Sequence, residues 1–242
     1  MIDSMGMWEN LDREFLNGRG IPATPEYTAR VGAMSFREAA EYTIRKFGFQ
    51  DTPEEMMAKW SRMVREQYAR HIGLKPHARE YLELLKKRGV ALGVATALPE
   101  ELSSPVLKRN GVFDWFQAFA TVEEAGRGKK YPDIYLLAAK KLRVPPNKCA
   151  VFEDVLPAVE GAKAAGMTVI AVYDAHSHAD EKAMRGKADR YIRGYSELLW
   201  DRQNAMRDPF LERECRKDAG KGLHSTPKKV RMILKEEGQR KS

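Results

Sequence analysis

The sequence predicts an α/β fold in which a parallel sheet carries helices on both faces and is joined to an all-helical part. Between about residues 5 and 72, one amphipathic helical pattern follows another. After residue 75, short apolar runs alternate with helical patterns, as in parallel sheets whose strands are connected by helices. The short runs are apolar almost throughout, which is typical of strands that are covered on both faces.

Residues 1–75 are predicted to form the helical part. Apolar residues recur at helical spacing in three segments, over residues 5–18, 35–48 and 52–73. The second segment opens with Ser35 as N-cap and Glu38 three residues on, which is the pattern of a capping box. The third opens with Thr52 as N-cap and Pro53 at the first helical position. The Met and aromatic residues of these segments are therefore expected to pack helix against helix.

Residues 76–200 are predicted to form the sheet and its helices. The strands are expected over residues 90–96, 116–121, 149–152 and 168–174, and the helices over 77–89, 104–111, 132–142 and 157–166. Residues 188–200 add a last short strand and helix. Gly166 is expected to end its helix in the left-handed conformation.

Residues 201–242 are expected to be a basic tail, loosely ordered or with a short helix, because the alternating pattern stops at Trp200. The tail holds 12 Lys and Arg against 7 Asp and Glu, whereas the rest of the chain holds 30 against 27. Most of the net charge of +8 therefore belongs to the tail. The near balance of the remainder argues against an enzyme dedicated to nucleic acid.

Composition narrows the class of protein. A hydrophobic share of 43% with 31% charged residues is that of an ordinary globular chain. No apolar run approaches the roughly 20 residues that cross a bilayer, and the N-terminus lacks the pattern of a secretory signal. Cys149 and Cys215 lie far apart and show no metal-ligand spacing. We expect a cytoplasmic protein without a membrane partner.

Polar side chains of three kinds follow the predicted strands. Thr96 offers a hydroxyl, Lys129 and Lys130 offer ammonium groups, and Glu153 with Asp154 offers two carboxylates. In open α/β sheets, ligands bind at the edge where the strands have their carboxyl ends. Carboxylates suit Mg²⁺, and a hydroxyl, an ammonium and a bound cation can together hold a phosphoryl group. Each residue alone also has an ordinary structural explanation, as a turn former, a solvated lysine or a helix cap.

These residues resemble the motifs of the haloacid dehalogenase-like hydrolases, a superfamily made up mostly of phosphatases. "LGVAT" ends in Thr96 as that family's second motif does, and "GKKYPDIYL" resembles the segment of its motif lysine. "FEDVLPAVEGAKAAGM" resembles its acidic motif. The resemblance covers about residues 1–200. It implies a Rossmann-like core and a helical cap, as in the phosphoglycolate phosphatase and β-phosphoglucomutase-like branch.

The resemblance also implies roles for single residues. Thr96 and Lys129 would be catalytic, Thr96, Ala97 and Lys129 would bind phosphate, and Glu153 and Asp154 would bind Mg²⁺. The chain departs from the family pattern where Ala97 replaces a common Asn and Lys130 a common Pro.

The family's first motif, DxDGT, has no match in the chain. "MIDSMGMW" resembles the segment that follows this motif, with Asp3-Ser4 at its end. The first Asp of the motif is the family's nucleophile and the second its acid and base. Both are expected upstream of Met1, so the chain is expected to be N-terminally truncated and inactive. The central first strand would be missing too, which leaves a gap in the sheet.

The intact protein is expected to hydrolyse a small phosphorylated metabolite with Mg²⁺, through an aspartyl-phosphate intermediate. Three alternatives stay open. A phosphomutase would share the architecture, a catalytically dead protein would only bind phosphate or metal, and residues 226–241 could bind nucleic acid. The five His residues receive no role.

Overall fold

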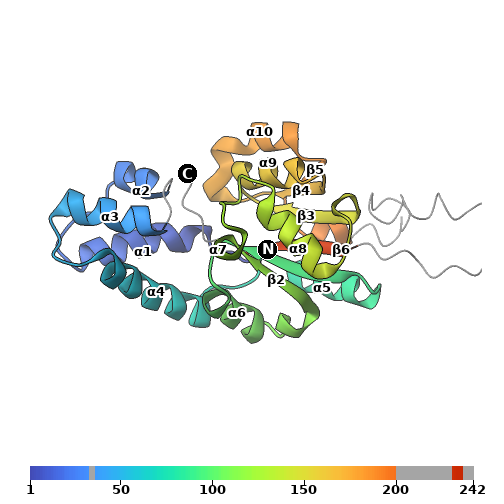
Figure 1. Ribbon diagram of the computed structural model, residues 1–242, viewed down its shortest axis with the longest axis horizontal. Helices are drawn as coiled ribbons and strands as arrows, with labels where there is room; N and C mark the ends of the chain where they lie inside the picture. The colour runs from blue at the N-terminus through green and yellow to red at the C-terminus, as the bar shows by residue number, and fades with distance from the viewer. Residues whose placement is uncertain (33–35, 200–230, 237–242) are drawn as a thin grey trace, which may run out of the picture.

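The computed structural model describes residues 1–32, 36–199 and 231–236, and it separates a helical part from a sheet part (Figure 1). The helical part contains α1 (Met5–Asn17), α2 (Pro25–Gly32), α3 (Phe36–Phe47) and α4 (Pro53–Arg70). The strands are β1 (Ala91–Thr96), β2 (Phe116–Thr121), β3 (Cys149–Glu153), β4 (Thr168–Val172), β5 (Arg190–Ile192) and β6 (Arg231–Glu236). The remaining helices are α5 (Ala78–Lys87), α6 (Glu100–Arg109), α7 (Val122–Ala125), α8 (Asp133–Leu142), α9 (Leu156–Ala164), α10 (Glu181–Lys187) and α11 (Ser196–Leu199).

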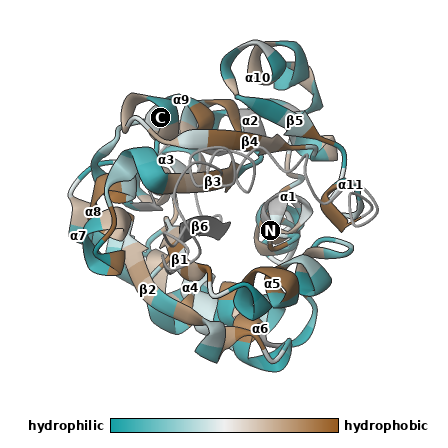
Figure 2. Ribbon diagram, turned by 90° about the vertical axis from the view of Figure 1, so that its right-hand side faces the viewer, coloured by the Kyte–Doolittle hydropathy of each residue, from teal (hydrophilic) through white to brown (hydrophobic). Residues whose placement is uncertain are grey.

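The strands form one parallel sheet in the order β2-β1-β6-β3-β4-β5. Apolar residues cover both of its faces, because consecutive strand residues point to opposite sides. Val151 of β3 belongs to the core under α8 and α9, whereas Phe152 packs against Tyr81 of α5 on the other face. Figure 2 shows the apolar strands β3 and β4 between the surrounding helices. The predicted α/β class with helices on both faces is confirmed.

The helical part has a core of its own, built from the residues that recur at helical spacing. Met56, Trp60 and Tyr68 of α4 are completely buried. The Trp60 and Phe15 rings pack edge to face, with their centroids 5.5 Å apart. The Thr52 hydroxyl accepts the N–H of Glu55, which completes the N-terminal cap expected there. The N-cap expected at Ser35 lies outside the described residues. None of the described helices is both long and apolar enough to cross a membrane.

β6 occupies the centre of the sheet, although its residues come from the segment expected to be a loosely ordered tail. It runs parallel to β1 on one side and to β3 on the other (Figure 1). The expectation of loose order is therefore wrong for residues 231–236, and no gap separates β1 from β3. The rest of that segment lies outside the described residues.

The physical reason for this position is backbone hydrogen bonding. A strand between two parallel neighbours satisfies N–H and C=O groups of both, and unsatisfied buried groups are costly. The run "VRMIL" supplies enough apolar residues for a short buried strand. The sequence pattern missed it because charged residues stand on both sides of the run.

Removing β6 should therefore destabilise the whole sheet. We expect a chain that ends at residue 230 to unfold at least about 6 °C lower than the full chain, which for a protein of this size corresponds to about 3 kcal/mol. A chain that ends at Glu236 is the control and should melt as the full chain does. Circular dichroism measures both transitions. Equal melting temperatures for the full chain and the shorter truncation would show that the sheet does not depend on β6.

Candidate active site

The polar residues predicted for the site lie at the same edge of the sheet. Thr96 ends β1, and Asp154 directly follows β3. In the strand register, Thr96 pairs with Glu236 of β6. On the other side of β6, Phe152 pairs with Leu234, so Asp154, two residues on, lies opposite position 236 as well. One strand lies between them, which places their backbones about 10 Å apart. Asp174, which follows β4, extends this row of polar residues.

The neighbouring acids Glu153 and Asp154 face two different lysines. A Glu153 oxygen lies 2.8 Å from the Nζ atom of Lys129, and both side chains are completely buried. The Tyr135 hydroxyl donates to the same carboxylate at 2.8 Å. Burial, and after it the charge of Glu153, raise the pKa of Tyr135 well above its usual value, so the phenol keeps the proton that it donates. Asp154 instead lies 3.6 Å from the Nζ atom of Lys75.

The loop before α8 brings Lys129 to this position. Lys129 is buried while the neighbouring Lys130 is exposed. The choice of Lys129 as the site lysine stays a prediction. Gly161 of α9 allows the loop to approach, because a Cβ atom there would lie 2.1 Å from the Lys129 carbonyl oxygen. The glycine in the segment "PAVEGAKAAG" thus has a packing reason that also positions the lysine.

Thr96 is completely buried, and its hydroxyl oxygen accepts the N–H of Leu98 at 3.0 Å. This bond holds the turn after β1 and leaves the hydroxyl hydrogen for another acceptor. Ala97, between them, is partly buried. The arrangement suits a residue that donates to an anionic oxygen at the edge of the sheet.

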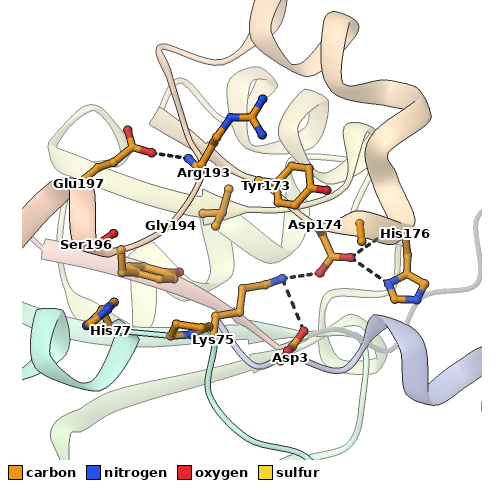
Figure 3. A pocket seen from close by; sticks show the side chains of 14 residues that line it. Asp3, Lys75, His77, Tyr173, Asp174, His176, Arg193, Gly194, Ser196 and Glu197 are labelled. Carbon is orange, nitrogen blue, oxygen red and sulfur yellow. Dashed lines mark hydrogen bonds and ion pairs between the residues drawn. The ribbon is translucent and has the colours of Figure 1, made fainter.

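Lys75 comes from the connection between the helical part and the sheet part. The backbone pairs with the start of the chain: Asp3 donates its N–H to Gly73, and Lys75 donates its N–H to Met1. The Lys75 side chain then reaches the sheet edge, where it donates a hydrogen bond to Asp174 (Figure 3). Burial lowers the pKa of Lys75, but the charges of Asp154, Asp174 and Asp3 outweigh it and the pKa is raised. The side chain is therefore an ammonium at neutral pH.

A cavity of about 540 Å³ opens beside this lysine. Figure 3 shows Lys75 and Asp174 pointing toward one another on one side of it, with Arg193 and Glu197 from the segment after β5 on another. His176 reaches in from the turn after β4, and its Nδ1 atom lies 3.1 Å from Asp174. The cavity therefore presents charged groups of both signs, as a site for a polar ligand would.

The arrangement of the carboxylates does not fit a divalent cation held by Glu153 and Asp154 together. Glu153 is engaged by Lys129 and Tyr135, whereas Asp154 faces Lys75. Within the described residues, no three His, Cys, Asp or Glu side chains are arranged to hold a metal ion. The predicted metal role of the two acids thus stays a prediction that this geometry does not support.

Two residues of the site, Lys75 and Asp174, had no role in the sequence analysis. Asp174 ends a predicted strand, as Thr96 does, and could have been found by the rule that singled out Thr96. Lys75 gave no such signal, because it lies in a connection 99 residues from its partner Asp174. His176 also joins the site through Asp174, whereas His178 pairs with Glu181 and is exposed.

Comparison with known proteins places the chain in a family. A family model described as haloacid dehalogenase-like hydrolase matches residues 7–166. The chain belongs to this family. A hexitol phosphatase B of Escherichia coli K12 is 33% identical over 178 residues, which cover 71% of this chain and 78% of that protein. A phosphorylated carbohydrates phosphatase of Thermotoga maritima is 28% identical over 185 residues, covering 76% and 85%.

Solved structures show the same fold. The CbbY protein of Rhodobacter sphaeroides in complex with phosphate superimposes with a TM-score of 0.69 at 22% identity, covering 82% of this chain and 91% of that one. The haloacid dehalogenase-like assignment and the Rossmann-like phosphatase fold expected from the motifs are thus confirmed.

The buried Lys129–Glu153 pair yields a test of the site's architecture. Lys129→Met leaves an uncompensated buried carboxylate, so it should lower the free energy of unfolding by about 3–5 kcal/mol. Lys130→Met removes an exposed charge and should change it by less than about 0.5 kcal/mol. Urea unfolding of both variants measures the difference. A larger loss for Lys130→Met would mean that the wrong lysine has been assigned.

The close approach at Gly161 yields a second test. Gly161→Ala should force the Lys129 loop away from α9, because the added carbon meets a backbone oxygen that cannot rotate aside. We expect a loss of about 1–3 kcal/mol in urea unfolding. Gly186→Ala in α10 is the matched control, since nothing lies within 4 Å of the added carbon there. An unchanged Gly161→Ala protein would contradict the packing described.

Proposed function

We propose that this chain binds the phosphate group of a small phosphorylated metabolite at the edge where β1 and β3 end, and that it belongs to a phosphatase acting on such esters. The observation that carries the proposal is the buried Lys129 ammonium, held 2.8 Å from Glu153 at the end of β3, while Thr96 ends β1 at the same edge of the sheet. A buried ammonium and a hydroxyl donor together favour an anionic ligand with oxygen acceptors.

Each residue has a definite part in this proposal. Thr96 donates its hydroxyl hydrogen to a phosphate oxygen, while its own oxygen stays bonded to the Leu98 N–H. Lys129 supplies positive charge, and Glu153 with Tyr135 fixes its position. Ala97 contributes backbone only, since its methyl group cannot donate a hydrogen bond. Thr96 and Lys129 are thus the residues proposed to stabilise charge on the transferring phosphoryl group.

Substrate class follows from the relatives. Two of them are named for phosphorylated carbohydrates and for hexitols. We therefore propose a small phosphorylated sugar or polyol as the ligand of this chain, and hydrolysis as the reaction. A phosphomutase is the alternative within the family, and it would return a phosphorylated isomer instead of inorganic phosphate. Action in the cytoplasm stays a prediction.

The nucleophile is the open part of the mechanism. The family resemblance assigns this role to the first Asp of DxDGT, and the 242 residues contain no Asp-x-Asp sequence. We therefore expect the chain as printed to bind phosphate without forming an aspartyl phosphate. Magnesium stays an expectation from the resemblance. No step is assigned to it, because Glu153 and Asp154 are directed to separate lysines.

Phosphate binding tests the proposal directly. Isothermal titration calorimetry of the full chain with inorganic phosphate, and separately with a hexitol phosphate, should show one binding site per chain. Thr96→Val should weaken it about tenfold or more, because a hydrogen bond to a charged group contributes about 1.5–3 kcal/mol. Thr96→Ser keeps the hydroxyl and should bind almost normally. If the Val and Ser variants bind equally well, Thr96 does not contact the phosphate.

A second experiment addresses hydrolysis. A chain that carries a DxDGT-containing segment ahead of Met1 should release inorganic phosphate from a hexitol phosphate, whereas the 242-residue chain should not. Release of phosphate by the 242-residue chain itself, lost in Thr96→Val, would show that another residue serves as nucleophile. Formation of a phosphorylated isomer would favour the mutase.

A further inference from the structure

The cluster around Lys75 brings three carboxylates to a single ammonium group. Its Nζ atom donates a hydrogen bond to Asp174 and lies 3.6 Å from Asp154 and 3.8 Å from Asp3. The side chains of Asp154 and Asp174 are 3% exposed and that of Lys75 is 9% exposed, whereas Asp3 is 61% exposed. Figure 3 shows two of these carboxylates, Asp174 and Asp3, directed at the nitrogen atom of Lys75. The third, Asp154, approaches the same nitrogen atom.

Distance separates this arrangement from a metal site. Carboxylate oxygens that bind Mg²⁺ or Ca²⁺ lie about 2.0–2.6 Å from the ion, and several must reach it together. Here two of the three oxygens lie well beyond that range from the shared centre. A metal ion at this centre would also have to displace the Lys75 ammonium, because two cations repel strongly in a partly buried site.

Charge explains why a cation is needed there. Asp154 and Asp174 are both buried, and a buried carboxylate without a compensating charge is costly. The neighbouring Glu153 has a buried lysine of its own, Lys129, whose Nζ atom lies 2.8 Å from it. Among the described residues, the other side-chain nitrogen that contacts Asp174 is the Nδ1 atom of His176, at 3.1 Å. Lys75 is therefore the permanent positive charge shared by the two buried aspartates.

We propose that the Lys75 ammonium is a tethered cation that takes the place of a divalent metal ion between Asp154, Asp174 and Asp3. The site then keeps its positive charge without a dissociable ion. Because Lys75 belongs to the connection between the helical and sheet parts, the same contact also holds that connection against the sheet edge. The proposal concerns the cation only and does not depend on which ester the protein binds.

Metal binding, measured apart from any turnover, tests this proposal. Electron paramagnetic resonance counts free Mn²⁺ as the full chain is titrated. The unaltered protein should bind no stoichiometric Mn²⁺ at 1 mM. Lys75→Met, which keeps the length of the side chain and removes its charge, should bind one Mn²⁺ at least tenfold more tightly. Lys87→Met removes an exposed lysine that pairs with Glu83, and as the control it should behave like the unaltered protein.

A charge-balanced variant covers the case in which Lys75→Met does not fold. The double variant Lys75→Met with Asp174→Asn removes one charge of each sign and leaves Asp3 and Asp154 to bind the ion. It should bind Mn²⁺ more tightly than the unaltered protein. Asp154→Asn in the same background should abolish that binding.

Two results would overturn the proposal. One is a stoichiometric Mn²⁺ site in the unaltered protein that Asp154→Asn removes. The other is a folded Lys75→Met protein, or failing that the folded double variant, that binds Mn²⁺ no better than the unaltered chain. Neither result depends on phosphate binding, so this proposal and the proposed function can fail separately.

Discussion

The division of two neighbouring carboxylates between two lysines governs the edge of the sheet. Glu153 and Asp154 are adjacent in the chain, but alternation along a strand sends their side chains to different sides. Each is buried and each therefore requires its own positive charge, which Lys129 provides for one and Lys75 for the other. The first lysine comes from the loop before α8 and the second from the connection that precedes α5. Two distant segments are thus held at the edge by one pair of acids.

This arrangement links packing to chemistry. Gly161 admits the Lys129 loop, Tyr135 shares Glu153 with the lysine, and Thr96 ends the strand on the other side of β6. The same contacts that satisfy buried charge also place a hydroxyl and an ammonium at one edge. A site of this kind is pre-organised, because its side chains are fixed by partners other than the ligand. The reach of Lys75 to Asp174 adds the helical part's connection to the same network.

The sequence predicted correctly those features that depend on residues close together in the chain. They include the apolar strand β3, the left-handed Gly166 at φ 73° after α9 and the helix cap at Thr52. Reasoning failed where the deciding partner is remote. Lys75 gains its role from Asp174, 99 residues away, and β6 gains its place from backbone groups of β1 and β3. The run "VRMIL" has only four apolar residues within a charged tail, and it gives no local indication that it pairs with two strands. The choice of Lys129 over Lys130 came from the family motif and stays a prediction, and the local pattern does not reveal that Lys129 is the buried one of the two.

The place of β6 also bears on the family's first motif. The slot between β1 and β3 accepts one strand, because each neighbour has only one row of hydrogen-bonding groups facing it. The resemblance assigns the central strand of the family's sheet to the segment that carries DxDGT. Such a segment and β6 cannot occupy the slot together, so adding the motif ahead of Met1 requires β6 to leave.

The two strands would exchange backbone hydrogen bonds of the same kind. Which strand occupies the slot then depends on the apolar residues that each buries and on the entropy of closing its connection. A strand joined directly ahead of Met1 has a short path to the edge, since Asp3 already pairs there with the connection at Gly73. β6 must instead be reached from Leu199 through 31 residues, which costs more closure entropy. The entropy of loop closure therefore favours the motif-bearing strand over β6 when both compete for the position between β1 and β3.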